Sequence, residues 1–131
     1  MKDGSREGKI VFTRSANRKV LIVDDDPGVR EVLRLILEIE DFDVVGEAVD
    51  GIEAIPQAVA YQPDFIVLDE QMPRRTGQET AAMIRNMVPT AQIIAFSAIL
   101  ERKPEWADAF LAKQNINDVG PLVEGLIDLR D

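Results

Sequence analysis

The sequence predicts an α/β protein whose doubly wound, five-stranded parallel sheet is covered by helices on both faces. Two observations carry this prediction. Five short apolar runs alternate along the chain with segments of helical periodicity, the order expected of repeated strand–helix units. The runs are also apolar on both faces, as parallel strands are when they lie between two helical layers. Because the crossovers are right-handed, the helices divide between the two faces.

Length and composition fit a single domain of this class. The chain has 131 residues, 46% of them hydrophobic and 30% charged, and a chain of this size buries about two-thirds of its unfolded surface. It contains no Cys and no His, which excludes disulfide scaffolds, Cys/His zinc sites and nucleophile systems that depend on histidine. Any chemistry must therefore use carboxylates, hydroxyls, lysine or a metal bound by oxygen ligands.

Charge is distributed unevenly along the chain. Residues 1–19 carry a net charge of +4 and residues 20–131 one of −13. We interpret residues 1–18 as a flexible basic extension, with an edge strand over 9–13 as the alternative, and residues 19–131 as the folded domain. The acidic body repels phosphate, so we expect the domain itself to bind no nucleic acid. Without a membrane-length apolar run or a signal peptide, we expect a cytoplasmic protein that contacts no membrane.

The first strand–helix unit begins at Val20–Val23, a short run rich in β-branched residues. Three aspartates follow this strand. Asp26 is suited to cap the next helix, and Pro27 suits the first helical position. The helix then presents one apolar stripe, made by Val29, Val32, Leu33 and Ile36 with Leu37 beside it.

The next two units follow the same pattern. Val44–Ala48 fits a strand, and a helix fits about Ile52–Tyr61, in which Pro56 should introduce a kink or delay the start. Phe65–Leu68 is the third strand and ends at an aspartate. A loop and a helix over about Gln78–Asn86 complete this unit.

The last part of the chain supplies two more strands and a helix. Ile93–Phe96 is the fourth strand, residues 98–108 are short and polar, and Ala109–Ala112 is the fifth strand. The last helix is capped by Asn117 or Asp118. Its predicted buried face consists of Val119, Leu122, Val123, Leu126 and Ile127. We expect no output domain within these 131 residues, and the chain either stands alone or belongs to a longer protein, two alternatives that the sequence does not distinguish.

Side chains that can carry chemistry stand where the strands end: Asp24 and Asp25 after the first, Asp69 after the third, Ser97 after the fourth and Lys113 after the fifth. The carboxyl ends of parallel strands share one edge of the sheet, where ligands bind in this fold class. Carboxylates gathered there stay ionised only beside a cation. Oxygen ligands with room for water suit Mg²⁺, with Mn²⁺ as an alternative.

Such a site can transfer a phosphoryl group. Asp69 is the best nucleophile toward phosphorus because it ends a central buried strand. Asp24, Asp25 and Asp69 would hold the metal, joined by the backbone carbonyl of Gln71. Lys113 would pair with the phosphoryl oxygens and Ser97 would donate a hydrogen bond to one of them. The plainer alternatives are an acidic loop at Asp24 and Asp25, a turn cap at Ser97 and a surface charge at Lys113.

Four segments in this order resemble the receiver domain of bacterial response regulators, of the chemotaxis-regulator type: VLIVDDDP (20–27), DEQMP (69–73) with Gly77, Ser97-Ala98, and FLAK (110–113). The resemblance covers about residues 19–131. It implies a flavodoxin-like sheet with strand order 2-1-3-4-5, in a two-component phosphorelay protein. It also implies Mg²⁺-dependent transfer to Asp69 from the phosphohistidine of a sensor kinase or phosphotransfer protein. The phosphoacceptor would be no enzyme beyond slow self-dephosphorylation.

The resemblance further implies a conformational switch and shows where this sequence departs from the family. Ser97 would move toward the phosphoryl group while Phe110 changes rotamer. Only 15 residues separate Ser97 from Lys113, about six fewer than in the family and nearly two helical turns. We therefore expect the fourth helix to be reduced to about one turn near Pro104–Ala107, or replaced by a loop. Lys113 also precedes Gln114, where the family usually has proline.

These departures leave alternative functions open. The fourth helix belongs to the output and dimerisation face of the family, so its loss favours a protein–protein interaction module with impaired or atypical switching. A Mg²⁺-dependent phosphohydrolase is a weaker alternative, because Gln71 occupies the position where such enzymes need an acid. A homodimer is a candidate assembly, while the sequence identifies neither the kinase nor the downstream target.

Overall fold

The computed structural model describes residues 18–72 and 75–130. The predicted basic extension and the alternative edge strand over 9–13 lie outside the described residues, apart from Arg18. That side chain is 7% exposed and stacks over the Phe42 ring at 4.1 Å. It donates to the carbonyls of Glu40 and Asp41 and pairs with Glu124 at 3.0 Å. Arg18 is therefore packed into the folded unit.

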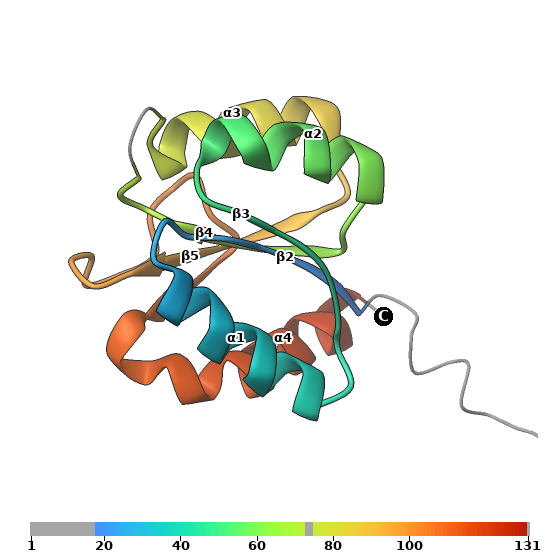
Figure 1. The fold of residues 1–131 in the computed structure, drawn as a ribbon, viewed down its shortest axis with the longest axis vertical. Coiled ribbons are helices and arrows are strands. Elements are labelled where there is room, and N and C mark those ends of the chain that lie inside the picture. The colour runs from blue at the N-terminus through green and yellow to red at the C-terminus, as the bar shows by residue number, and fades with distance from the viewer. Residues whose placement is uncertain (1–17, 73–74, 131) are drawn as a thin grey trace, which may run out of the picture.

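The described chain folds into a three-layer α/β unit (Figure 1). Its elements are β2 (Lys19–Val23), α1 (Pro27–Ile39), β3 (Asp43–Ala48), α2 (Gly51–Tyr61), β4 (Phe65–Asp69), α3 (Gly77–Met87), β5 (Gln92–Ser97), β6 (Ala109–Ala112), the 3₁₀ helix η2 (Lys113–Asp118) and α4 (Val119–Arg130). The strands are parallel in the order β3-β2-β4-β5-β6. This is the predicted order 2-1-3-4-5.

Two apolar cores separate the layers. Helices α1 and α4 cover one face of the sheet, and α2 and α3 cover the other (Figure 1). Every residue of β4 is buried, because this strand lies at the centre of the sheet with helices on both sides. The site residues that follow β2 or end β4 are therefore attached to buried strands inside the sheet. None of the described helices combines the length and apolar character needed to cross a bilayer.

Capping residues set the starts of the helices. The Asp26 carboxylate accepts from the backbone N–H groups of Gly28 and Val29, with Pro27 at the first helical position as predicted. The predicted stripe of α1 is wrong at Val32, which is 43% exposed. Leu33 and Leu37 are the buried residues of this helix, so its buried face is rotated away from Val32.

Helix α2 starts without the delay that Pro56 was expected to impose. The Asp50 carboxylate accepts from the backbone N–H of Glu53 at 2.9 Å, and the helix runs from Gly51 to Tyr61 with Pro56 inside it. The missing N–H of Pro56 leaves the carbonyl of Ile52 without its helical donor. Both residues lie on the exposed side of the helix, where water can satisfy that carbonyl.

The connection between β5 and β6 replaces a helix. Residues 98–108 are all described, and none of them lies in a helix or a strand. A single turn closes where the backbone N–H of Ala107 donates to the carbonyl of Pro104 at 3.2 Å. This agrees with the predicted reduction at Pro104–Ala107. Trp106 packs from this loop against the core beneath α2 and α3.

The chain reaches the last helix through a 3₁₀ helix that the sequence analysis did not predict. Lys113 follows the fifth strand, β6, as predicted, and is the first residue of η2, which continues into α4. The buried face of α4 is as predicted: Val119, Val123 and Leu126 are buried, and Leu122 and Ile127 pack against the same core.

Candidate functional site

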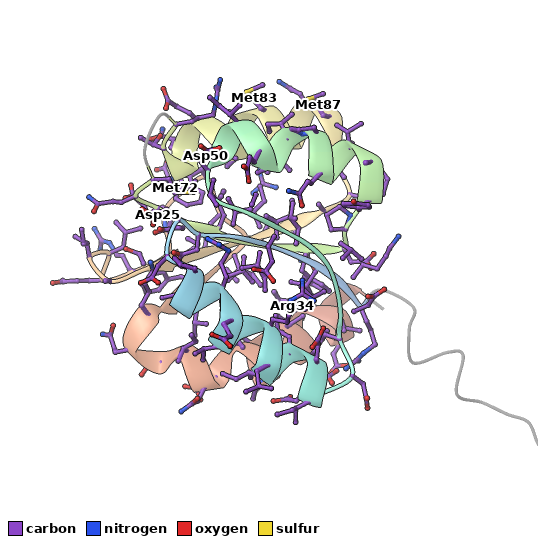
Figure 2. The ribbon with its side chains drawn as sticks, viewed as in Figure 1. Asp25, Arg34, Asp50, Met72, Met83 and Met87 are labelled. Atoms are coloured by element: carbon purple, nitrogen blue, oxygen red, sulfur yellow. The ribbon has the colours of Figure 1, made fainter. Side chains whose placement is uncertain are left out.

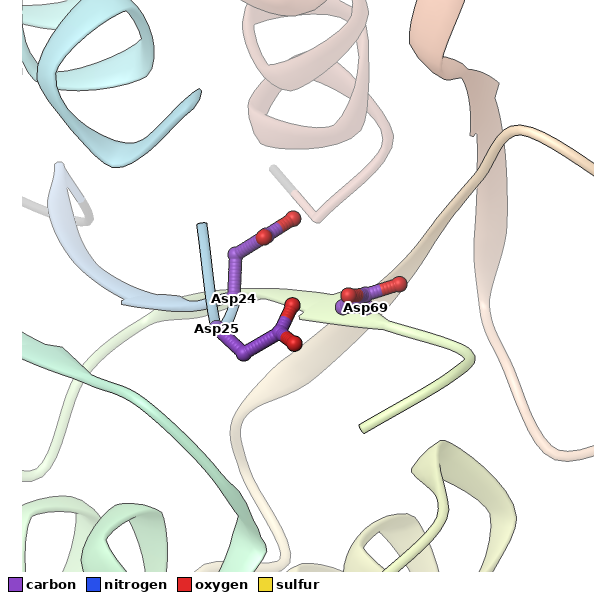
Figure 3. A group of neighbouring side chains, drawn as sticks. All are labelled: Asp24, Asp25 and Asp69. Atoms are coloured by element: carbon purple, nitrogen blue, oxygen red, sulfur yellow. The ribbon is translucent and has the colours of Figure 1, made fainter. Parts of the chain in front are cut away.

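The predicted acidic residues converge at the carboxyl edge of the sheet. Asp24 and Asp25 follow β2, and Asp69 ends the adjacent strand β4. One carboxylate oxygen from each lies within 4.8 Å of the others. Figure 3 shows the three side chains beside one another. Asp24 and Asp69 are buried, at 0% and 4% exposure. Asp25 is exposed and lies at the edge between the helical layers (Figure 2).

Lys113 supplies the cation of this cluster. Its Nζ lies 2.9 Å from Asp24 Oδ2 and 3.4 Å from Asp69 Oδ2. Because β5 separates β6 from β4, the side chain must cross the end of β5, where it passes the Phe96 ring with Nζ 5.3 Å from the centroid. The predicted juxtaposition of Lys113 with the acidic residues is therefore present.

Asp24 is held by hydrogen bonds at its N–H, its Oδ1 and its own carbonyl. Its N–H donates to the carbonyl of Ala48 at 3.0 Å, and its Oδ1 accepts from the N–H of Asp26 at 2.9 Å. Its own carbonyl accepts from Arg30 Nη1 at 2.6 Å. The sequence analysis missed Arg30. The feature of the sequence that could have indicated its role is the position of this arginine, one turn into the helix that begins just after the acidic residues.

The backbone around Asp69 is equally constrained. Asp69 Oδ1 accepts from the N–H of Gln71 at 3.2 Å, and the N–H of Gly77 donates to the carbonyl of Glu70 at 3.1 Å. A Cβ atom at position 77 would lie 2.8 Å from the carbonyl oxygen of Asp69. Glycine is therefore required there because helix α3 begins against the backbone of the site.

The electrostatics of the cluster follow from burial and like charge. Burial, followed by repulsion from Asp24, raises the pKa of Asp69 to about 6, although Lys113 and the Gln71 N–H oppose this. Burial lowers the pKa of Lys113, but its hydrogen bond and charge interactions with Asp24 and Asp69 outweigh burial and raise it. Lys113 therefore stays protonated while Asp69 is easier to protonate than an ordinary aspartate.

Ser97 lies beside the acidic cluster and also caps a turn. Its Oγ accepts from the backbone N–H groups of Ile99 and Leu100, both at 3.0 Å. Ser97 thus has the capping contact of the plainer interpretation, while its O–H proton stays available as a donor. An open pocket of about 150 Å³ is lined by Asp25, Asp69, Gln71, Ser97, Ala98, Ile99 and Lys113.

Phe110 does not line this pocket. It lies on β6 between Ala109 and Leu111, which are buried in the core beneath α1 and α4. Since side chains alternate along a strand, Phe110 points to the opposite face, where the connection 98–108 passes in place of a helix. It is only partly buried there.

The donor set fits a hard divalent cation. Three carboxylates offer oxygens within 4.8 Å of one another, and Gln71, whose backbone carbonyl was the predicted further ligand, lines the same pocket. Exposure of Asp25 leaves one side of the cluster open to water. Mg²⁺ typically binds through one or two carboxylates and keeps several waters.

A parallel α/β sheet with an acidic cluster and a lysine at its carboxyl edge defines the class of receiver-like domains. Comparison with known families agrees. The model of the response regulator receiver domain matches residues 20–118, and the chain belongs to this family.

Relatives in the same family include two kinds of regulator. The chain is 37% identical over 113 residues to the transcriptional regulatory protein PdtaR of Mycobacterium tuberculosis, an alignment of 82% of this chain and 55% of PdtaR. The chain thus spans about half of PdtaR. It is 40% identical over 81 residues to the chemotaxis protein CheY of Listeria monocytogenes, covering 62% of this chain and 68% of CheY.

Solved structures share the fold. The response regulator domain of Thermotoga maritima CheB superposes with a TM-score of 0.73 at 28% identity, covering 85% of this chain and 93% of that one. TrrA of Thermotoga maritima, solved in complex with Mg²⁺ and BeF, gives a TM-score of 0.75 at 30% identity, with 83% and 98% covered.

Proposed function

We propose that this chain is a phosphoacceptor that receives a phosphoryl group on Asp69 from a phosphohistidine of a sensor kinase or phosphotransfer protein. The observation that carries the proposal is a buried aspartate at the carboxyl edge of the sheet, with a lysine Nζ at 3.4 Å and two further carboxylates beside it. In the reaction an Asp69 oxygen attacks phosphorus. The P–O bond forms, the P–N bond breaks, and the imidazole leaves with the electron pair and takes up a proton.

The residues around Asp69 have distinct roles in this proposal. Lys113 would follow the developing charge from the Asp69 oxygen to the phosphoryl oxygens, since it already lies between Asp24 and Asp69. Ser97 would donate its O–H to a phosphoryl oxygen. Phe110 would respond by a change in packing, because it has no hydroxyl group. The pKa of about 6 leaves Asp69 largely ionised, and thus nucleophilic, near pH 7.

Asp24, Asp25, Asp69 and the backbone carbonyl of Gln71 would hold Mg²⁺, or Mn²⁺ in its place. The metal would neutralise charge on the transferring group. The protein's own contribution is to keep the ligands in place before the metal binds: Asp24 and Asp69 are buried, and backbone N–H groups fix one oxygen of each. We place this reaction in the cytoplasm and count dephosphorylation as slow and self-limited.

Mass spectrometry after treatment with acetyl phosphate and MgCl₂ tests the proposal. We expect one phosphoryl group on the wild-type chain and none on Asp69→Asn. Asp43→Asn is the matched control, because this exposed aspartate begins β3 at the opposite edge of the sheet. Equal phosphorylation of Asp69→Asn and the control at the same stoichiometry would show that Asp69 is not the acceptor.

A protein–protein interaction module with impaired or atypical switching remains the second candidate function. The observation in its favour is the connection 98–108, which forms no helix and leaves Phe110 partly exposed. Comparing backbone chemical shifts and oligomeric state before and after phosphorylation separates the two functions. Shift changes that reach β6 and α4, or a new homodimer, support switching, whereas changes confined to the pocket favour the module.

A further inference from the structure

An arginine on α1 binds the backbone of the acidic residues. Arg30 Nη1 lies 2.6 Å from the carbonyl oxygen of Asp24, and its Nε lies 3.1 Å from Glu47 Oε1 on β3. The side chain is 15% exposed. Arg30 therefore joins the edge strand β3 to the turn that carries Asp24 and Asp25, although it touches none of the three clustered carboxylates in the described contacts.

The Asp24 carbonyl fixes the position of the next residue. A peptide unit is planar, so holding this oxygen also fixes the plane that contains the N–H and Cα of Asp25. The other end of Asp24 is held by its N–H, which donates to Ala48 at 3.0 Å. Asp25 is exposed and has no such burial to hold it. The contact from Arg30 restrains its peptide on one side, and the Asp26 N–H, which donates to Asp24 Oδ1 at 2.9 Å, restrains the turn on the other.

Arg30 is itself held in place. Glu47 accepts from Arg30 through one oxygen and from Arg34 Nε through the other at 2.6 Å. Figure 2 shows Arg34 on α1 beside the sheet. Burial raises the pKa of Glu47, but the hydrogen bonds and charges of Arg34 and Arg30 outweigh burial and lower it. Glu47 therefore stays ionised and orients the Arg30 guanidinium, whose N–H donors form a rigid planar fork.

We propose that Arg30 is a positioning residue that sets the affinity of the acidic cluster for Mg²⁺ by fixing the Asp24–Asp25 peptide. This inference rests on the metal site of the proposed function. Side chains that orient metal ligands from behind typically change metal affinity by about 10–100-fold when they are replaced.

The electrostatic effect of Arg30 has the opposite sign. A cation close to the cluster repels Mg²⁺, so replacing Arg30 by a neutral residue would tighten Mg²⁺ binding if charge alone mattered. Loss of positioning would weaken binding. Weaker Mg²⁺ binding after Arg30 is replaced therefore indicates positioning, whereas tighter binding indicates charge repulsion alone.

The experiment is calorimetric titration of MgCl₂ into the wild-type chain, Arg30→Met and Arg34→Met at one pH and ionic strength. Arg34→Met is the matched control. Like Arg30→Met, it removes one positive charge from α1 and one ion pair with Glu47, but it leaves the contact between Arg30 and the Asp24 carbonyl in place. We expect Arg30→Met to raise the Kd for Mg²⁺ about 10-fold and Arg34→Met to change it less than about two-fold.

A second measurement covers the case of a poorly folded Arg30→Met. Arg30→Lys keeps the charge, but it replaces the planar guanidinium, which reaches Glu47 and the Asp24 carbonyl through two different nitrogens, by one compact ammonium. We therefore expect it to weaken Mg²⁺ binding as well. In the metal-free protein the amide resonances of Asp25 and Asp26 should shift in both Arg30 variants and stay unchanged in Arg34→Met.

The outcomes distinguish this inference from the proposed function. Unchanged or tighter Mg²⁺ binding in both Arg30 variants would overturn the positioning role while leaving the metal site intact. Equal weakening in Arg30→Met and Arg34→Met would also overturn it, since the shared partner Glu47 would then be responsible. A wild-type chain that binds no Mg²⁺ would refute the metal site itself and this inference with it.

Discussion

The Asp69 carboxylate should cost the metal-free protein stability at neutral pH. Burial and the neighbouring Asp24 raise the pKa of Asp69 to about 6 from an ordinary value of 3.8. The folded protein therefore binds this proton more tightly than the unfolded chain does. Asp69→Asn removes the charge while keeping the shape of the side chain and an oxygen that accepts from Gln71. We expect this substitution to stabilise the metal-free protein.

The magnitude follows from the two pKa values. A rise of the Asp69 pKa from 3.8 in the unfolded chain to about 6 in the folded protein corresponds to about 3 kcal/mol of lost folding stability at a pH where Asp69 is ionised in both states. Since the pocket beside Asp69 is open to solvent, screening reduces this to about 1–2 kcal/mol. For a chain of this size, that stabilisation raises Tm by roughly 3–8 °C.

The pH dependence has a definite sign. Well below pH 3.8 Asp69 is protonated in both the folded protein and the unfolded chain, so the penalty is absent, and at pH 4 only a small part of it has appeared. As pH rises through the window from 3.8 to about 6, the unfolded chain loses its proton first and the wild-type protein loses stability. The advantage of Asp69→Asn should therefore be full at pH 7.5 and small at pH 4.

Urea unfolding in EDTA, followed by circular dichroism at both pH values, measures this difference. Asp43→Asn again serves as the control, because it replaces an exposed aspartate away from the cluster, and its effect should be small at both pH values. An Asp69→Asn protein that is less stable than wild type at pH 7.5 would refute the reasoning. So would a stabilisation of equal size at pH 4, because that effect could not come from the carboxylate charge.

Two further predictions concern the metal and the backbone of the site. Mg²⁺ at about 100 times its Kd should stabilise the wild-type chain by about 2.7 kcal/mol. Thermal unfolding should show this gain in stability for the control Asp43→Asn but not for Asp25→Asn. An equal gain in both variants would exclude Asp25 as a ligand. Gly77→Ala should destabilise the chain by about 2 kcal/mol or more, because its Cβ would lie 2.8 Å from the Asp69 carbonyl oxygen. Gly125→Ala on α4, whose Cβ would meet nothing within 4 Å, should stabilise it by up to about 1 kcal/mol; the same sign for both glycine variants in urea unfolding would contradict this steric argument.

The sequence could predict the strands and the edge where the site forms because both depend on local patterns. A buried parallel strand is a short apolar run, and its last residue faces the carboxyl edge, so Asp69 and Ser97 were placed by counting along the chain. The rotation of α1 was harder to predict. Val32 has the spacing of the buried stripe but is 43% exposed, since the helix turns its Arg30 and Arg34 side toward Glu47 on β3.

Contacts to backbone atoms and a local turn of the backbone escaped the sequence analysis for a related reason. Arg30 binds the Asp24 carbonyl only because α1 packs back over the end of β2. Every residue has a backbone carbonyl, so the amino-acid sequence does not show which of them accepts from an arginine. The 3₁₀ helix η2 was missed because Lys113 ends an apolar run and looks like the end of a strand. In the structure its backbone already turns, and the side chain can then cross β5 to reach Asp24.

In the proposed function, acceptance of a phosphoryl group and its output would be separable, because different elements of this chain would carry them. The residues proposed for acceptance lie at the ends of β2, β4, β5 and β6, and the shortened connection 98–108 does not displace them: Ser97 caps its first turn, and Lys113 lies within 3.4 Å of Asp69. The face that the missing helix would cover instead carries Phe110, which is partly exposed and does not line the pocket. A change at Asp69 must therefore reach that face through the Ser97 turn and the loop that follows it, since no helix is present there to move as a unit.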